Sequence, residues 1–411
     1  MNQPTLRKDF PLINRLPLVY LDNAATAHKP QAMIDALQHF YADSYGTVHR
    51  GLYALGEQAT SSYEQARATV AQFINAATEE IIFTKGTTES INLVAAAWAL
   101  YHLKAGDEIL LTEVEHHANL LPWQWVAEQT GAQLVFIPLD GKNYVLQNPA
   151  AYVSSKTKLV AVTLSSNVLG PVWAAGDLAV LTQRAHEVGA VVLFDAAQVV
   201  SHAPIDVRSL KADFVVFSGH KLFGPTGSGV LYASRSVQGA MHPYQRGGSM
   251  VYEAWFDHAI WQDGPQKFEA GTPLIAEAIG LAASVAYLQK NIDWDLLHKH
   301  EAALCRELIK GLKTMPRVTI VGNRERLATE GHLVSFVVQG IHAHDIAGML
   351  SNKGIAVRAG HLCAQPLVRA LGHESLVRVS VALYNTTAEI ELFLRELENT
   401  IALFNQLVEQ S

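Results

Sequence analysis

Up to residue 233, short runs of apolar residues alternate with longer stretches in which apolar residues recur every three or four positions. The longer stretches predict helices, at residues 31–45, 63–76, 87–102 and 177–189. The short runs predict strands, at residues 81–84, 108–113, 133–139, 159–165, 191–195, 214–218 and 229–233. Several of these strands are almost wholly apolar, as strands buried on both faces are. The alternation favours an α/β fold with a large, mostly parallel sheet of seven strands.

The pattern changes after Pro273, where a long apolar helix is predicted at residues 274–288. Fewer strands follow, at residues 318–321, 332–338 and 376–382, flanked by amphipathic helices at residues 295–312 and 387–407. This order predicts a smaller C-terminal α+β domain packed on the first. We therefore expect an N-terminal arm over residues 1–20, a large α/β domain over 21–272 and a small domain over 273–411.

Composition and charge exclude several classes of function. The chain is 49% hydrophobic, carries a net charge of −7 and has no lysine–arginine block, so no nucleic-acid partner is expected. Its longest apolar stretch, residues 91–103, is far shorter than the ~20 residues of a membrane span, so no membrane partner is expected either. With only two cysteines and no apolar signal segment near the N-terminus, the protein is expected to be cytoplasmic.

Two neighbouring predicted strands end in chemically reactive residues. The strand at residues 191–195 ends in Asp195, and the strand at 214–218 is followed by Lys221. Because parallel sheets bind ligands beyond the carboxyl ends of their strands, this pair suits pyridoxal 5′-phosphate (PLP). The lysine would form a Schiff base, and the carboxylate would keep the pyridine nitrogen protonated. Either residue alone has a simpler interpretation, as a helix cap or a solvated loop lysine. The pair, followed by the glycine-rich segment 224–229, favours the cofactor.

At these residues the chain resembles the class V aminotransferase family. The resemblance rests first on Asp195-Ala196-Ala197-Gln198 and on the run from Ser218 to Gly227. It continues through most of the chain, in segments 20–26, 48–51, 85–92, 115–119, 269–273 and 358–366. Within the family the chain is most similar to the group II cysteine desulfurases of the SufS/CsdA type. This resemblance implies PLP fold type I, the fold of aspartate aminotransferase.

The resemblance also implies roles for the cofactor-binding residues. Lys221 carries the cofactor, Asp195 pairs with its pyridine nitrogen, and Gln198 contacts its ring hydroxyl. His116 stacks on the ring and can move a proton, and Asn167 contacts the ring or the substrate. The residues that bind the phosphate are Thr87, Thr88, Ser218 and His220, with Thr272 contributed by a neighbouring subunit of a homodimer. Thr88 lies where a turn opens a predicted helix, whose amide groups favour a dianion.

The resemblance assigns the sulfur chemistry to Cys363, which follows a turn after the apolar residues 355–357. The residues expected to bind substrate are Asn167, Arg358, Arg378, His49 and Arg50, and Arg378 matches the arginine that holds the substrate carboxylate. Leu362 departs from the family, where histidine often precedes the cysteine, which weakens the case for activation by an adjacent imidazole; the nearby Arg358 and His361 can favour the thiolate instead. Cys305, inside a predicted helix, is expected to be an inert packed thiol. Neither His116-His117 nor His342-Ala343-His344 has further ligands at zinc spacing, so no metal is expected.

The implied activity is the conversion of L-cysteine to L-alanine, with transfer of sulfur to Cys363 as a persulfide. The implied recipient is a SufE/CsdE-like acceptor protein, and the implied pathway is iron–sulfur cluster assembly. L-selenocysteine is a second implied substrate. Two alternatives remain at this point: another class V reaction such as transamination, and a non-catalytic scaffold with the same fold.

Overall fold

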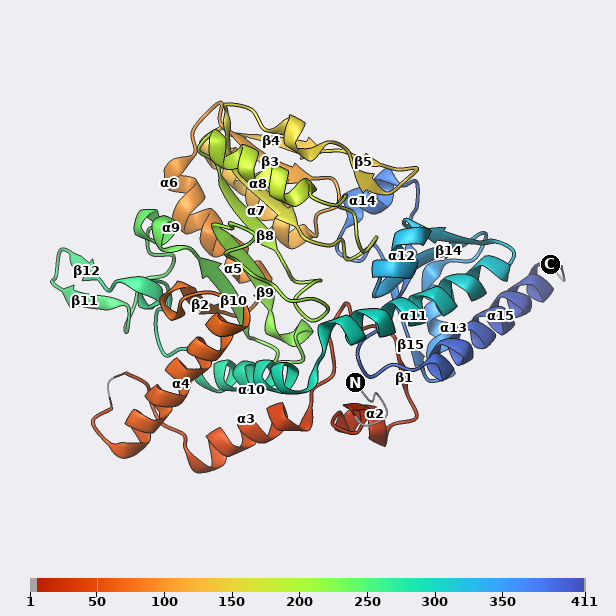
Figure 1. Ribbon diagram of the computed structural model, residues 1–411, viewed down its shortest axis with the longest axis horizontal. Coiled ribbons are helices and arrows are strands. Elements are labelled where there is room, and N and C mark those ends of the chain that lie inside the picture. Colours follow the sequence, from red (N-terminus) through yellow and green to blue (C-terminus); the bar gives the residue numbers. More distant parts are fainter. Residues whose placement is uncertain (1–5, 50, 410–411) are drawn as a thin grey trace.

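The computed structural model describes residues 6–49 and 51–409 and is built around a seven-stranded sheet (Figure 1). The strand order is β2-β10-β9-β8-β7-β3-β4, and every neighbouring pair is parallel except those that involve β10. The strands are β2 (Ile81–Thr84), β3 (Glu108–Thr112), β4 (Gln133–Ile137), β7 (Thr157–Thr163), β8 (Val191–Asp195), β9 (Phe214–Ser218) and β10 (Gly229–Ala233). The predicted fold class is confirmed, since all seven predicted strands form this sheet.

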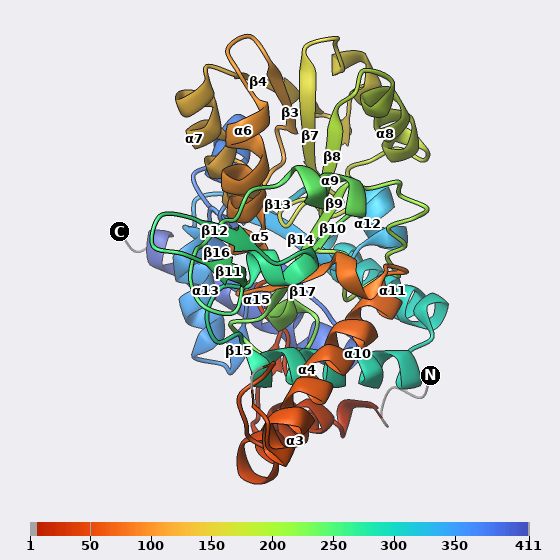
Figure 2. The same cartoon turned by 90° about the vertical axis from the view of Figure 1, so that its left-hand side faces the viewer.

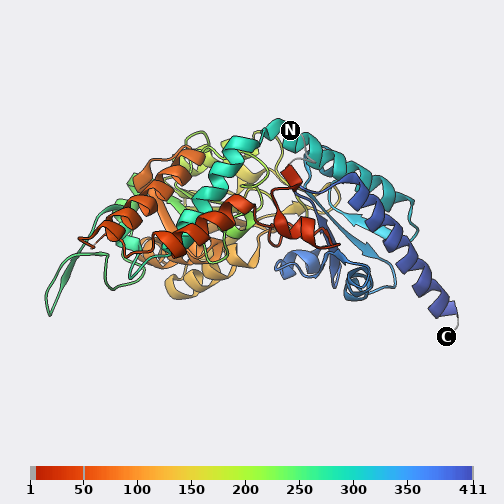
Figure 3. The same ribbon diagram turned by 90° about the horizontal axis from the view of Figure 1, so that it is seen from below.

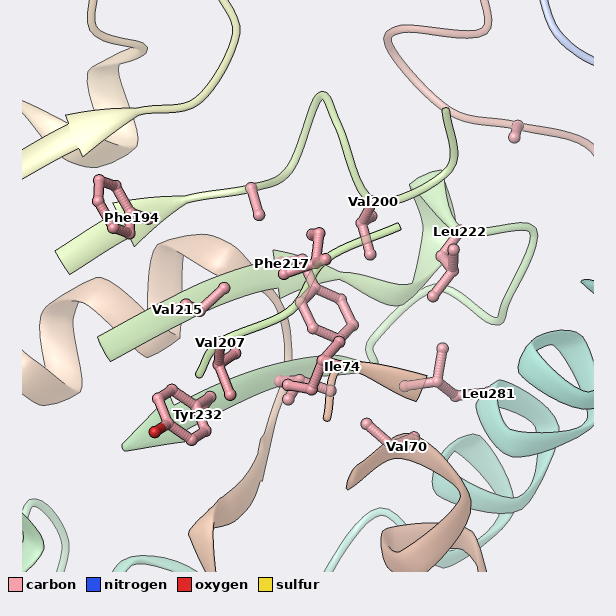
Figure 4. Packing of buried hydrophobic residues seen from close by; sticks show 14 of the residues in the cluster. Val70, Ile74, Phe194, Val200, Val207, Val215, Phe217, Leu222, Tyr232 and Leu281 are labelled. Atoms are coloured by element: carbon pink, nitrogen blue, oxygen red, sulfur yellow. The ribbon is translucent and has the colours of Figure 1, made fainter. Parts of the chain in front are cut away.

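Alternate side chains of each strand face opposite sides of the sheet and enter two separate cores. Phe194 and Phe217 face one core, to which α4 (Ala54–Phe73), α8 (Asp177–Glu187) and α10 (Ile275–Asn291) contribute (Figure 4). Leu193 and Val216 face the other core, which is shared with α5 (Thr87–Val94), α7 (Leu121–Thr130) and α9 (Arg235–Ala240). Figure 2 shows α7 and α8 on opposite sides of the strands. Helix α5 continues through a π-helical turn, Ala95–Ala99, into α6 (Leu100–His102).

A second, antiparallel sheet lies beside the first, with the order β13-β14-β17-β16. Its strands are β13 (Val318–Val321), β14 (Leu333–Val338), β16 (Arg358–Gly360) and β17 (Leu376–Ser380). The helices of its core are α11 (Trp294–Thr314), α13 (Ala343–Ser351) and α15 (Thr387–Glu409), and α11 and α15 lie side by side in Figure 3. The shorter helix α12 (Arg324–Glu330) packs on α11, whereas α14 (Gln365–Ala370) places Leu367 and Val368 in the core shared with the large sheet.

The segments that join the two units do not follow the expected limits closely. Strand β1 (Val19–Tyr20) pairs with β15 (Ile355–Ala356), which ties the end of the N-terminal segment to the small unit. Helix α10 packs on α3 (Gln31–Asp43) and α4, and its apolar residues enter a core of the large sheet. The division at residues 272 and 273 therefore stays a prediction, and this packing favours a limit after α10.

Besides short 3₁₀ turns, the described chain also contains α2 (Pro11–Arg15) and the hairpins β5–β6 (Leu139–Asp140 and Val145–Leu146) and β11–β12 (Val251–Ala254 and Ala259–Trp261). The β11–β12 hairpin projects from the large unit (Figure 1) and exposes Tyr252 and Phe256. Among the described residues, no helix combines the length and apolar character needed to cross a membrane.

Candidate active site

The chemically reactive residues meet at the carboxyl edge of the large sheet, where they line a cavity of about 300 Å³. Asp195 ends β8, and Lys221 ends a 3₁₀ turn directly after β9. His116 follows β3, and the small unit closes the cavity from the other side. The predicted site residues that line the cavity are Thr87, Thr88, His116, Asn167, Asp195, Gln198, Ser218, His220, Lys221, Arg358, Cys363 and Arg378. Its remaining lining residues, unassigned from the sequence, are Ala24, Ala25, Ala118, Thr163, Ser165, Ala197 and Leu362.

Lys221 and Asp195 influence each other across the base of the cavity. Burial lowers the pKa of Lys221 to about 8; the charge of Asp195 acts against this shift, and the charge of Arg378 reinforces it. Near pH 8 a large share of the amine is therefore neutral, which is the form that attacks a carbonyl carbon. Burial raises the pKa of Asp195, although its carboxylate accepts the amide N–H of Ala197 at 2.9 Å and faces the Lys221 ammonium. A buried anion at this position favours a protonated ring nitrogen as its partner.

One corner of the cavity is arranged to bind an anion. Ser218 Oγ lies 2.9 Å from the amide nitrogen of Thr87 and 2.8 Å from the hydroxyl oxygen of the same residue. These two hydrogen bonds join the end of β9 to the first residue of α5. Gly86 precedes this helix with φ 153°, and a side chain on Gly229 is excluded because its Cβ would lie 2.3 Å from Gly86 Cα. Burial, reinforced by the charge of Lys221, lowers the pKa of His220 to about 4, so its ring is neutral. The start of a helix suits a phosphate.

His116 stands at the cavity wall as a neutral imidazole. Burial lowers its pKa to about 4, and the charge of Lys221 lowers it further. Its Nδ1 accepts the amide N–H of Ala118 at 3.0 Å, which leaves the proton of the neutral ring on Nε2. Gln198 is oriented by a bond from its Nε2 to the carbonyl oxygen of Ala24, at 3.0 Å. The ring and the amide are thus fixed before any ligand enters.

The guanidinium groups of Arg358 and Arg378 share the carboxylate of Asp22, a residue to which the sequence assigned no role. Asp22 accepts from Arg358 at 2.5 Å and from Arg378 at 3.3 Å. Arg378 is almost fully buried and also donates to the carbonyl oxygen of Asn167 at 2.9 Å. Its Nε has no hydrogen-bond partner among the described residues, and the same holds for Asn167 Oδ1. Buried polar atoms normally have partners, so these two indicate where a polar ligand group binds.

The two cysteines have opposite environments. Cys363 is exposed and lies on the loop between β16 and α14, on the wall of the cavity. Cys305 is buried within α11, where burial raises the pKa of its thiol far above the ordinary value. A thiol that stays protonated is a poor nucleophile. Leu362 packs into the core of the large sheet, so its side chain anchors the cysteine loop.

Two predicted residues do not reach this cavity. Thr272 lines a separate hollow together with Lys85 and Tyr244. His49 instead contacts Glu64, with 2.9 Å between Nε2 and the carboxylate. Arg50 lies outside the described residues. As for metals, the described part of the chain holds no group of three or more histidine, cysteine, aspartate or glutamate side chains that could bind an ion.

The residues present fit PLP. The cavity offers an amine for the aldehyde, a buried carboxylate for the pyridine nitrogen and a helix start for the phosphate. Its two unpartnered buried atoms, Asn167 Oδ1 and Arg378 Nε, provide an acceptor and a donor for further polar groups of the cofactor and a substrate.

Comparison with known sequences places the chain in a family. The class-V aminotransferase profile matches residues 19–393. The chain belongs to the class-V aminotransferase family. The predicted resemblance is therefore confirmed, and the cofactor of this chain is PLP. When bound, PLP withdraws electrons from the carbon atoms of an amino-acid substrate through its protonated ring.

Several relatives of this chain are named for one activity. A probable cysteine desulfurase from Synechocystis is 46% identical over 98% of this chain and 96% of its own length. A probable cysteine desulfurase from Mycolicibacterium paratuberculosis is 44% identical over 95% of this chain. This chain spans 57% of the length of that second relative. The crystal structure of the cysteine desulfurase CsdA from Escherichia coli matches with a TM-score of 0.90 and 39% identity, over 98% of this chain and 99% of that one.

We expect Asp195→Asn to slow Cα deprotonation at least about a hundredfold while PLP still binds, because the substitution removes the charge and keeps the shape. The measurement is single-turnover loss of deuterium from Cα-labelled cysteine. Asp213→Asn is the matched control. Asp213 precedes β9 at the opposite end of the sheet and accepts the amide N–H of Val192 at 2.8 Å. A rate near wild type in Asp195→Asn would contradict the assigned role.

Proposed function

We propose that this chain is a PLP-dependent cysteine desulfurase, which converts L-cysteine to L-alanine and receives the sulfur on Cys363 as a persulfide. The observation that carries the proposal is an exposed thiol in the same cavity as Lys221, Asp195 and Arg378. A transaminase needs no thiol at this position. The names of the relatives support the same activity.

Each step of the reaction has a residue in position. Arg378 binds the substrate carboxylate through the guanidinium atom that lacks a partner, and Asn167 accepts a polar group beside it. The amine of Lys221 takes the proton from Cα. The thiolate of Cys363 then attacks the substrate sulfur, so that an S–S bond forms as the Cβ–Sγ bond breaks. The electron pair of the broken bond stays with Cβ, which is protonated, and a proton is returned to Cα to give alanine. The neutral ring of His116 can move one of these protons.

The test is to supply L-cysteine to the PLP-loaded protein and to quantify alanine, persulfide and 3-mercaptopyruvate, the keto acid that transamination of cysteine yields. One alanine and one Cys363 persulfide per active site are expected in the absence of a reductant. A keto acid without persulfide would instead indicate transamination. No product at all would indicate a scaffold. L-Selenocysteine is proposed as a second substrate, and a parallel measurement of alanine and selenide tests it.

The exposure of Cys363 supports transfer of its sulfur to a second protein. We assign this role to a SufE/CsdE-like acceptor that serves iron–sulfur cluster assembly. The protein is proposed to act in the cytoplasm, where its two free cysteines remain reduced. A purified acceptor of this type should accelerate turnover of cysteine, whereas an acceptor variant that lacks its own cysteine should not.

We expect a homodimer in which each subunit completes the other's site. Thr272 lies outside the active-site cavity of its own subunit. The β11–β12 hairpin exposes Phe256 fully and Tyr252 strongly, and these side chains provide an apolar surface for a partner. Such an interface should be large and apolar. Sedimentation at assay concentration should give twice the mass of the 44.9 kDa chain. A fully active monomer would rule out shared sites.

A further inference from the structure

The loop that carries Cys363 has a backbone conformation that residues with side chains rarely adopt. Leu362 and Cys363 follow each other with φ values of 56° and 55°. Consecutive left-handed residues of this kind are disfavoured by contacts between Cβ and the backbone. They persist where surrounding contacts hold them, and they are found most often at functional sites. Contacts from neighbouring segments must therefore hold this loop in its conformation.

Two bonds from the large unit hold the carbonyl groups of this pair. The side-chain amide of Asn167 donates to the carbonyl oxygen of Leu362 at 2.6 Å. The main-chain N–H of His117 donates to the carbonyl oxygen of Cys363 at 2.8 Å. Both donors follow strands of the large sheet, whereas the loop follows β16 of the small sheet. The loop is thus fixed from the opposite side of the cavity.

The ring of His117 makes a third bond that the reaction described above does not use. Its Nε2 accepts the amide N–H of Gln365 at 3.1 Å. Gln365 is the first residue of α14, and Ala364 at the N-cap position has no side-chain acceptor. The first amides of a helix lack partners within it, so the imidazole replaces the missing cap. Burial, reinforced by the charge of His361, lowers the pKa of His117, which keeps the ring neutral and able to accept.

We propose that His117 is a positioning residue that holds the thiol of Cys363 toward the cavity by capping α14 from the large unit. Its main-chain N–H fixes the carbonyl group of Cys363 through a hydrogen bond, and its ring fixes the amide of Gln365. Without the ring, the loop relaxes toward ordinary backbone conformations and the thiol turns away from the substrate. This role rests on the proposed desulfurase function, but the cap itself can be tested without turnover.

Hydrogen exchange of the PLP-loaded protein tests the cap directly. In His117→Ala, peptides covering residues 361–371 should exchange roughly fivefold faster, the size expected for a lost helix cap. His117→Gln, which retains an acceptor, should exchange nearly as wild type. His342→Ala is the matched control, because His342 caps α13 through its ring in the same way, with 3.3 Å between Nδ1 and the amide of His344. Should His117→Ala not fold, His117→Phe removes the acceptor while keeping a ring.

Turnover tests the consequence for the thiol. His117→Ala should lower kcat for alanine formation from cysteine about tenfold with little change in KM, and His117→Gln should recover most of the loss. Cleavage of selenocysteine, which depends less on the thiol, should change little. Unchanged exchange at 361–371, or an equal loss with both substrates, would overturn the positioning role. If the wild-type protein forms no alanine, the desulfurase proposal fails while exchange still decides whether His117 is the cap.

Discussion

Replacing Lys221 by alanine should remove the covalent attachment of PLP and lower alanine formation by roughly four orders of magnitude or more. The substitution deletes both the amine that anchors the cofactor and the base that takes the Cα proton. Loss of the base alone lowers the rate about 10²–10⁴-fold. The fold should survive, because Lys221 extends into a cavity instead of packing in a core. The absorbance of bound PLP and the circular dichroism of the protein measure the two effects separately.

A second lysine provides a stringent control for this assignment. Burial lowers the pKa of Lys29 to about 8, the same value as for Lys221, so the two amines are similarly available as nucleophiles. Lys29 instead donates to the carbonyl oxygens of Ala27 at 2.7 Å and His220 at 3.0 Å, and it does not line the cavity. Borohydride reduction of the wild-type protein should therefore label Lys221 alone. Label on Lys29 would overturn the assignment.

Strands that are apolar along their whole length could be predicted almost to the residue. The limits 81–84, 191–195, 214–218 and 229–233 agree with β2, β8, β9 and β10, because a strand buried on both faces stands out against the polar residues that bound it. Helix α4 was predicted to begin at residue 63 and begins at Ala54. Its first two turns bury only Gly56 and Ala59, whose small side chains give no apolar periodicity.

Some residues of the site could likewise be predicted from the sequence, and others could not. Residues at strand ends, such as Asp195 and Lys221, could be predicted because the topology of a parallel sheet brings strand ends together. Asp22 and His117 were not assigned roles, because their roles depend on segments distant in sequence. Asp22 meets Arg358 across 336 positions, and His117 meets Gln365 across 248. Thr272, which lies outside the cavity of its own chain, retains its role as a prediction about the dimer.

Replacing Cys363 by serine should separate the two proposed substrates. With cysteine, breaking the Cβ–Sγ bond requires a soft nucleophile at the substrate sulfur, and a hydroxyl group is a poor one, so alanine formation should fall by at least about a thousandfold. With selenocysteine, the more stable selenolate can leave without that attack, and a measurable rate should remain. The spectral changes that follow cysteine binding should persist, because Lys221 and Asp195 are untouched.

Cys305→Ser is the matched control for this substitution. Cys305 is buried within α11, and burial raises the pKa of its thiol so far that it supplies no thiolate at neutral pH. Turnover of both substrates should therefore stay near wild type, although a buried hydroxyl group without a partner costs about 1–3 kcal/mol of stability. Alanine formation from each substrate, with persulfide mapping on the wild-type protein, distinguishes the two thiols. Full activity of Cys363→Ser on cysteine, or a persulfide found only on Cys305, would show that sulfur takes a different route.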